Sequence, residues 1–270
     1  QLLGRAIALG ASGMQAAIVC GPALGGLLYV AGAGVVYGVC AVLLVAGVAL
    51  MLGVSYDHQP APGKVSLRAA LAGAHFVCHN KILLGALSLD LFAVLLGGAT
   101  ALLPMFARNI LHTGPEGLGL LRAAPAVGAL LISVVLLRWP LERRAGPWLM
   151  VSVAIFGAAT IVFGLSHHFW LSLAALAVTG AADNVSVVVR QTLAQAETPD
   201  DIRGRVSAVN SIFIGASNQL GEFESGATAA LFGAVGSVVL GGVGTLVVAA
   251  AWCWLFPALA RRDRLVEHRP

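Results

Sequence analysis

The stretch GRVSAVNSIFIGASNQLGEFESG, residues 204–226, is the most informative part of the sequence because its pattern occurs twice in the chain. Residues 4–26, GRAIALGASGMQAAIVCGPALGG, align with it without gaps at an offset of 200. Six positions are identical: Gly4, Arg5, Ala8, Ala16, Gly21 and Gly26 correspond to Gly204, Arg205, Ala208, Ala216, Gly221 and Gly226. Each copy begins with Gly-Arg and continues as an apolar run, so we interpret the pair as an internal repeat.

The composition around this repeat is typical of a membrane protein. Of the 270 residues, 59% are hydrophobic and 10% charged, and the mean hydropathy is +0.90, whereas a soluble domain has about a quarter charged residues. Apolar runs of about 17 to 25 residues can cross the hydrocarbon core as helices. Eight such runs lie near 6–28, 31–53, 82–106, 117–137, 147–165, 169–189, 206–232 and 237–257. The sequence therefore predicts an all-α integral membrane protein with about eight transmembrane helices.

The basic residues predict the orientation of these helices. One set of alternate connections holds fourteen of the sixteen Lys and Arg residues: Arg5, Lys64, Arg68, Lys81, Arg138, Arg143, Arg144, Arg190, Arg203, Arg205, Arg261, Arg262, Arg264 and Arg269. The other set holds Arg108 and, just inside a helix, Arg122. Because positive charge stays on the cytoplasmic side of short loops, both ends are predicted to be cytoplasmic. The net charge of +4 then requires no nucleic-acid partner.

The repeat predicts how the helices are grouped. If the first predicted helix corresponds to the seventh, the unit is six helices, as in transporters with two parallel six-helix halves. Residues 1–53 would then be the last two helices of an N-terminal half whose first four are missing, and the chain, which begins at Gln1, would be a fragment. The remaining predicted regions are a cytoplasmic linker at 54–81, a complete six-helix C-terminal half at 82–258, and a cytoplasmic tail at 259–270.

Two segments resemble the major facilitator superfamily, in particular the bacterial efflux branch that contains the enterobactin exporter. Within CGPALGG, residues 20–26, Gly21, Pro22, Gly25 and Gly26 match the antiporter motif of the family's fifth helix, although Ala17 stands where that motif often has Gly. Residues 190–226 resemble the segment that joins the tenth and eleventh helices. The resemblance implies a secondary transporter of the bacterial inner membrane, which exports a drug-like or siderophore-like molecule by alternating access, coupled to protons.

The ionisable residues inside the predicted spans are candidates for a substrate or proton pathway. They are Asp90, Arg122, Asp183, Glu222 and Glu224. A charge facing lipid costs about 2.5 to 3.5 kcal/mol, so we expect these side chains to face the protein interior. A structural role stays open for each: Asp90 could be satisfied by hydrogen bonds, and Asp183 could pair with Arg190, two turns further on the same helix face.

Glu222 and Glu224 cannot both face one cavity, because two positions on a helix differ by about 200°. We expect one glutamate to pair with Arg122, which lies at a similar depth, and the other to face the cavity or the opposite half of the transporter. The alternative is that both make polar contacts between helices.

The remaining chemistry-bearing residues favour no cofactor. Arg190, Arg203 and Arg205 are assigned to a cytoplasmic gate or loop, and Cys20, Cys40, Cys78 and Cys253 have no spacing that suggests a metal site or disulfide framework. His167 and His168 form a turn far from any Cys, and no nucleotide-binding motif occurs. An integral membrane enzyme, a subunit of an assembly with a buried polar site, or an inactive transporter fragment are the alternatives. An enzyme would need a nucleophile and base, or metal ligands, at one depth, and the sequence offers no such group.

Overall fold

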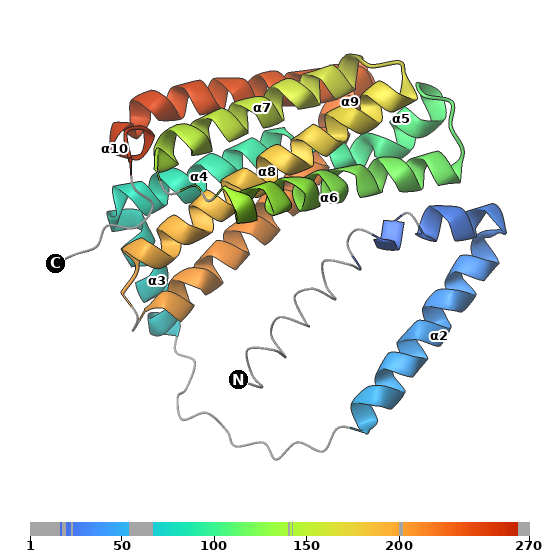
Figure 1. The fold of residues 1–270 in the computed structure, drawn as a ribbon, viewed down its shortest axis with the longest axis horizontal. Helices are drawn as coiled ribbons and strands as arrows, with labels where there is room; N and C mark the ends of the chain where they lie inside the picture. The colour runs from blue at the N-terminus through green and yellow to red at the C-terminus, as the bar shows by residue number, and fades with distance from the viewer. Residues whose placement is uncertain are drawn as a thin grey trace.

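The computed structural model describes residues 17, 20–22, 24–53, 67–139, 141, 143–199 and 202–263. These residues are helical and contain no strand, which confirms the predicted all-α class. Six helical segments in this part are long and apolar enough to cross a membrane. They are α2 (Ala33–Leu52), α4 with α5 (Lys81–Asn109), α6 (Pro115–Arg138), α7 (Ala145–Leu165), α8 (Phe169–Glu197) and α9 (Arg203–Leu255), shown in Figure 1.

Helix α9 is a hairpin of two spans and not one helix of 53 residues. Gly233 has φ 76° and ψ 167°, a conformation that glycine adopts without strain. The Thr228 and Ser237 hydroxyls lie 2.7 Å apart, and the Ser237 hydroxyl donates to the Ser225 carbonyl at 3.0 Å. The two arms run in opposite directions (Figure 1). The hairpin thus accounts for the predicted spans 206–232 and 237–257.

The predicted span 82–106 is interrupted. Helix α4 (Lys81–Leu96) ends before Gly97 and Gly98, a 3-10 turn η1 (Ala99–Leu102) follows, and α5 (Leu103–Asn109) completes the crossing. The hydroxyl of Ser225 in α9 donates to the Gly98 carbonyl at 3.2 Å. Irregular backbone at membrane depth is tolerated only where protein buries it or where it lines a cavity. The break in α4 therefore lies where protein, or a cavity inside the protein, surrounds the backbone.

Small residues set the closest helix contacts in the bundle. A Cβ added to Gly180 of α8 would overlap the Pro125 carbonyl of α6, and one added to Gly128 of α6 would overlap the Ala177 carbonyl of α8. Polar side chains tie the same two helices, since Asn184 Nδ2 donates to Ser133 Oγ at 2.9 Å. Close backbone approach of this kind is typical of helix packing in membranes, where hydrophobic burial does not drive association.

Apolar layers fill the space between the helices. One layer joins Leu89 of α4, Leu149 of α7 and Val189 of α8. Another contains Phe106 of α5 and Phe163 of α7, whose ring centroids are 4.6 Å apart. Trp252 of α9 donates to the Gly85 carbonyl of α4 at 3.2 Å, which holds the second arm of the hairpin against α4.

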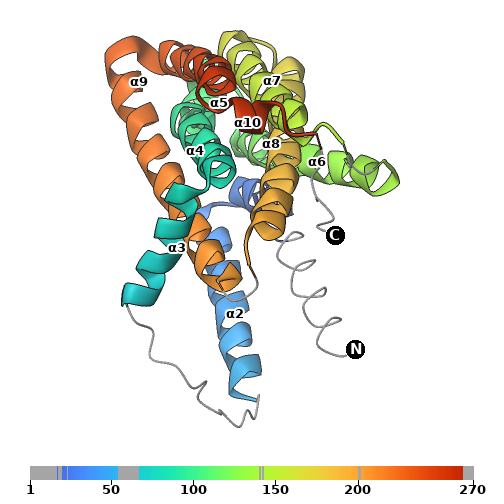
Figure 2. The ribbon, with the colours of Figure 1, turned by 90° about the vertical axis from the view of Figure 1, so that its left-hand side faces the viewer.

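The N-terminal part of the described structure lies beside this bundle. Helix α2 buries none of its residues and lies apart from the bundle in Figure 1, and its far end extends beyond the other helices in Figure 2. Helix α3 (Leu67–His79) packs against the start of α9 through Val77, Val206 and Val209. It occupies the end of the region predicted as a linker, whose residues 54–66 lie outside the described part. Most of the predicted span 6–28 also lies outside it, as do the tail residues 264–270.

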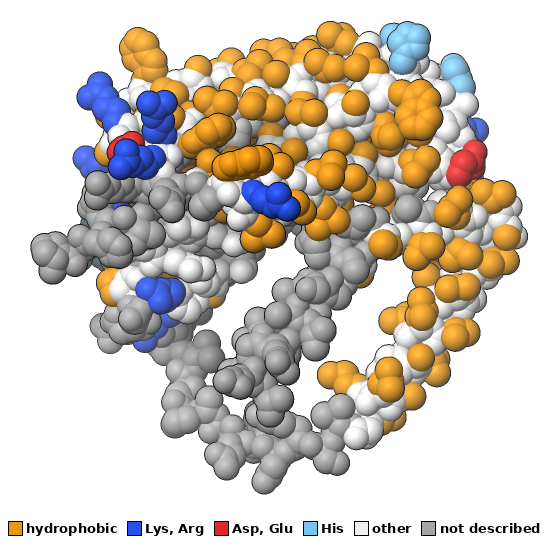
Figure 3. All heavy atoms as spheres, viewed as in Figure 1, with side chains coloured by type: hydrophobic (Ala, Val, Ile, Leu, Met, Phe, Trp, Pro, Cys, Tyr) orange, Lys and Arg blue, Asp and Glu red, His pale blue; other side chains and the backbone are white. Residues whose placement is uncertain are grey.

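The surface agrees with a membrane environment. Apolar side chains cover the visible face of the bundle, and Lys and Arg side chains gather at the end that holds α10 (Pro257–Ala260) and α3 (Figure 3). At this end the Arg262 guanidinium pairs with Glu197 at 2.7 Å, and the Gly146 amide donates to the Arg262 carbonyl at 3.0 Å. The chain is a multi-pass membrane protein with one basic end, here called the α10 end.

Candidate functional site

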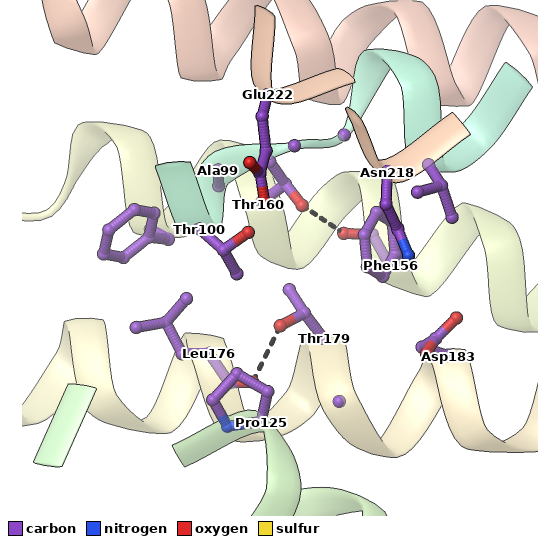
Figure 4. Close-up of a pocket in the computed structure, with 15 residues that line it drawn as sticks. Ala99, Thr100, Pro125, Phe156, Thr160, Leu176, Thr179, Asp183, Asn218 and Glu222 are labelled. Carbon is purple, nitrogen blue, oxygen red and sulfur yellow. Dashed lines mark hydrogen bonds between the residues drawn. The ribbon is translucent and has the colours of Figure 1, made fainter. Parts of the chain in front are cut away.

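A cavity of about 200 Å³ lies inside the bundle where α4 is broken (Figure 4). We call it the central cavity. It is lined by Val94, Gly97, Gly98, Ala99, Thr100, Pro125, Phe156, Thr160, Phe163, Leu176, Thr179, Gly180, Asp183, Asn218 and Glu222. These residues come from α4, η1, α6, α7, α8 and the first arm of α9, so every span of the bundle except the last contributes to the wall.

Two carboxylates face this cavity from opposite walls. Figure 4 shows Glu222 on α9 above the helix break and Asp183 on α8 on the other side. Asn218 lies one helical turn before Glu222 and therefore shares its face. Within the described residues, neither carboxylate accepts a hydrogen bond or forms an ion pair. Both are thus free to bind a proton or a donor group on a ligand.

The cavity distinguishes the two glutamates of α9. Glu222 lines it, and Glu224 does not. Glu224 is half-buried, and its backbone carbonyl accepts a hydrogen bond from the Thr228 hydroxyl at 2.9 Å. The sequence indicated that the two side chains differ in direction, and the structure identifies Glu222 as the one that faces the cavity.

Two of the threonine hydroxyls that line the cavity are not available to donate to a ligand. Thr160 donates to the Phe156 carbonyl at 2.9 Å, and Thr179 donates to the Leu176 carbonyl at 2.7 Å (Figure 4). Each hydroxyl therefore uses its proton within its own helix. The polar groups left to a ligand are the two carboxylates, the Asn218 amide and the Thr100 hydroxyl.

A smaller cavity adjoins the central one and is lined by three further polar side chains, Asp90, Ser152 and Ser186. Its volume is about 10 Å³, and Asp90, Asp183 and Ser186 line it together with Val94 and Phe156. Asp183 lines both cavities and so lies between them. Ser186 is buried, and its hydroxyl has no hydrogen-bond partner in the described structure.

Behind the smaller cavity, Asp90 of α4 forms an ion pair with Arg190 of α8. Both residues are buried, and the Arg190 Nε atom has no hydrogen-bond partner among the described residues. The alternative that Asp183 pairs with Arg190 does not hold, because Arg190 pairs with Asp90. Arg190 is also not in a loop, since α8 continues to Glu197, and its assignment to a cytoplasmic gate stays a prediction. Asp183 and Arg190 are two turns apart, about 10 Å along the helix. The neighbouring α4 supplies a carboxylate at the level of Arg190.

Arg122 does not join the carboxylates. It is exposed and lines a separate cavity of about 650 Å³, whereas Glu222 lines the central cavity. The predicted pairing of Arg122 with a glutamate is therefore wrong for the part of the chain that the structure describes. A similar depth along the bundle does not determine which cavity a side chain faces.

The antiporter-like motif lies against the start of α6. Pro22, Gly25 and Gly26 line the cavity that holds Arg122. A Cβ on Gly26 would lie 2.7 Å from the Pro115 carbonyl oxygen and 2.9 Å from the Gly119 Cα atom. A Cβ on Gly21 or Gly25 would meet nothing within 4 Å. Only Gly26 of the motif is thus required for this close helix crossing.

The two remaining gate candidates lie at the basic end of the bundle. Arg203 Nη2 donates to the Gln195 carbonyl at 3.3 Å, which connects the end of α8 to the start of α9. The Arg205 backbone packs against Gly73 of α3, where an added Cβ would lie 2.9 Å from the Arg205 carbonyl oxygen. Both arginines therefore lie where three helices meet at the α10 end.

Sequence reasoning missed two features of the central site. The first is the helix break, for which the paired glycines at 97–98 were the available signal. The second is Ser186, one turn after Ala182 on the buried face of α8. A single serine in an apolar helix gives no signal of its own, because most such hydroxyls bond to their own backbone.

Comparisons with known proteins agree with this architecture. The model of a family described as transmembrane secretion effector matches residues 1–265. The enterobactin exporter EntS of Citrobacter koseri is 27% identical over 236 residues, which cover 86% of this chain and 53% of the exporter. EntS of Shigella boydii serotype 18 is 27% identical and EntS of Escherichia coli O1:K1 26% identical, each over 238 residues with the same coverage. The chain thus spans about half the length of the curated relatives it matches.

Proposed function

Because the chain belongs to the transmembrane secretion effectors of the major facilitator superfamily, we propose that it acts in proton-coupled export of a small organic molecule. Members of this superfamily are transporters and not enzymes, which argues against the enzymatic alternative. In this proposal the protein lies in the bacterial inner membrane and works by alternating access. The similarity to proteins named enterobactin exporters supports a siderophore-like or drug-like substrate.

The observation that carries the proposal is the pair of carboxylates in the central cavity. Asp183 and Glu222 lie at membrane depth without a protein partner among the described residues. A carboxylate in that position is costly unless it binds a proton or a cationic group in function. Two such groups on opposite walls of one cavity, formed around a broken helix, fit a site where proton binding and substrate binding influence each other.

The smaller cavity offers a route from Asp183 to the buried ion pair. About 10 Å³ is enough for one water molecule. Asp90, Asp183 and Ser186 supply the two to four polar partners that a buried water needs. A change of charge on Asp183 would then act on Asp90 and Arg190 through this one water molecule. The ion pair would thereby link proton binding at Asp183 to the packing of α4 against α8.

The distribution of basic residues supports the orientation. Lys and Arg gather at the α10 end (Figure 3), where α3 and the starts of α7 and α9 also lie. With positive charge on the cytoplasmic side, this end faces the cytoplasm and the α5 end faces outward. Both chain ends are then cytoplasmic, and the central cavity lies between the two surfaces.

An export assay in enterobactin-producing bacteria that lack their own EntS tests the proposal. Expression of the protein in these cells should restore enterobactin in the medium, and an uncoupler of the proton gradient should abolish the effect. Asp183→Asn and Glu222→Gln should reduce export to the level of cells without the protein, because each removes a carboxylate from the cavity.

Glu224→Gln is the matched control, since it makes the same chemical change two residues from Glu222 but outside the cavity. Export by this variant should equal that of the parent, at equal amounts of protein in the membrane. Parent-level export from Asp183→Asn and Glu222→Gln, with the same response to the uncoupler, would contradict proton coupling through these residues.

A further inference from the structure

We propose that the cavity lined by Arg108 and Arg122 binds an organic anion, an acidic head group on an apolar body. We call it the arginine cavity. It lies between the N-terminal helical residues, α5 and the start of α6, and is separate from the central cavity. The proposal concerns binding and does not rest on the proposed export.

The size of the arginine cavity suits a small molecule. Its volume of about 650 Å³ lies within the range of about 300 to 1,000 Å³ that is usual for ligand sites. Pro22, Tyr29, Val36 and Leu118 supply much of an apolar wall. Gly25 also lines it and has open space where a side chain would be, so the glycine adds room for a ligand.

The charge of the arginine cavity has one sign. Arg108 stands in the last turn of α5 and Arg122 in the second turn of α6, and both line it. Within the described residues, neither guanidinium has an ion-pair or hydrogen-bond partner, and no Asp or Glu lines the cavity. Two unpaired guanidinium groups facing one space repel each other. An anion between them removes the repulsion and receives charge-assisted hydrogen bonds from both.

One acidic group stands near the rim. Glu116 is in the first turn of α6, and its carboxylate lies over the start of its own helix, since a Cβ on Gly114 would be 2.6 Å from Glu116 Oε1. It does not line the cavity, but its negative charge opposes an anion nearby. The central cavity has the opposite character, with two carboxylates and no basic residue among its lining. The arrangement therefore selects by charge.

Binding of two ions of the same shape and opposite charge tests this inference. The purified chain in detergent micelles is dialysed against tetraphenylborate or tetraphenylphosphonium, and the bound amount is measured at equilibrium. We expect the borate to bind more tightly by about tenfold or more, because the two guanidinium charges attract the borate anion and repel the phosphonium cation of the same shape.

Variants assign the binding to the arginine cavity. Arg108→Gln and Arg122→Gln should each reduce borate affinity several-fold without weakening phosphonium binding. Arg138→Gln, the same change at the other end of α6 and outside the cavity, should have no effect. Glu116→Gln should increase borate affinity. Gly25→Leu should block borate by filling the space while leaving every charge in place.

Lipid composition identifies the source of the natural anion. The measurement is repeated in nanodiscs of phosphatidylcholine alone or with phosphatidylglycerol. If the anionic lipid displaces borate from the parent, the site holds lipid head groups; if it does not, the site is for a water-soluble organic anion. Equal affinity for borate and phosphonium would overturn the proposal. So would parent-like borate binding by a folded Arg108→Gln, Arg122→Gln double variant, with folding checked by circular dichroism.

Discussion

Arg190 and Asp90 are the two charged side chains that the described structure buries, and they form one ion pair. Sequence reasoning placed Asp183 and Arg190 on the same face of α8, which is right, because Asp183 lines the small cavity in front of the pair. It could not identify Asp90 as the partner. Helical periodicity relates residues of one helix, whereas the partner comes from α4, about a hundred positions earlier.

Asp90→Asn should destabilise the protein strongly. Removing one partner of a buried ion pair leaves an uncompensated charge and costs about 3 to 5 kcal/mol. Thermal unfolding in detergent, followed by circular dichroism, should show the loss. The double variant Asp90→Asn, Arg190→Gln should recover most of it, since no unpaired charge remains.

The comparison of these two variants separates a structural role from a role in proton transfer. If the double variant regains stability but not export, the pair acts in the mechanism as well as in the fold. An Asp90→Asn protein as stable as the parent would show that the ion pair contributes little to folding.

At the scale of helices, glycine contacts determine how closely the spans approach. Gly180 and Gly128 bring α6 and α8 together, and Gly26 brings the N-terminal helical residues to α6. The sequence contains 33 glycines, and their number alone could not show which of them matter, because contact depends on the neighbouring helix. Gly226 shows the contrast, since an added Cβ there would meet nothing within 4 Å.

Gly180→Ala and Gly226→Ala should therefore change stability in opposite directions. The first forces a methyl group into the Pro125 carbonyl, and overpacking of this kind costs about 1 to 3 kcal/mol. The second gains up to about 1 kcal/mol from helix propensity without a clash. Unfolding temperatures of the two purified variants check the sign. Equal changes in unfolding temperature for the two variants would mean that α6 and α8 can move apart enough to accommodate an added methyl group.

For the whole molecule, seven of the eight spans predicted from hydropathy correspond in order to spans of the described structure, and most of the first, 6–28, lies outside it. The observed α2, α6 and α7 begin and end within about two residues of their predictions, and the reversal at Gly233 falls between the two last predicted spans. The signal is strong because every span must be apolar over about 20 residues. No comparable pattern in the sequence indicates which helices lie side by side. The residues that form the central cavity come from five spans, and the pattern of one helix does not identify its neighbour.

Cysteine labelling tests the predicted orientation. After replacement of Cys20, Cys40, Cys78 and Cys253, a single cysteine is placed at Arg144, just before α7, or at His168, in the turn between α7 and α8. A membrane-impermeant maleimide added to intact cells should label the cysteine at 168 and leave the one at 144 unlabelled until the membrane is opened. Labelling of both from one side would contradict the topology.

The reversal at Gly233 joins the last two spans more tightly than an ordinary loop would. The Ser237 hydroxyl donates to the Ser225 carbonyl and contacts the Thr228 hydroxyl, so these hydrogen bonds restrict movement of the turn. The first arm is held to the helix break by Ser225, and the second arm to α4 by Thr245, whose hydroxyl donates to the Ala93 carbonyl at 3.3 Å. A displacement of either arm should therefore move the other arm and the residues on both sides of the break in α4. The hairpin is thus a rigid unit that is attached to α4 on both sides of its break.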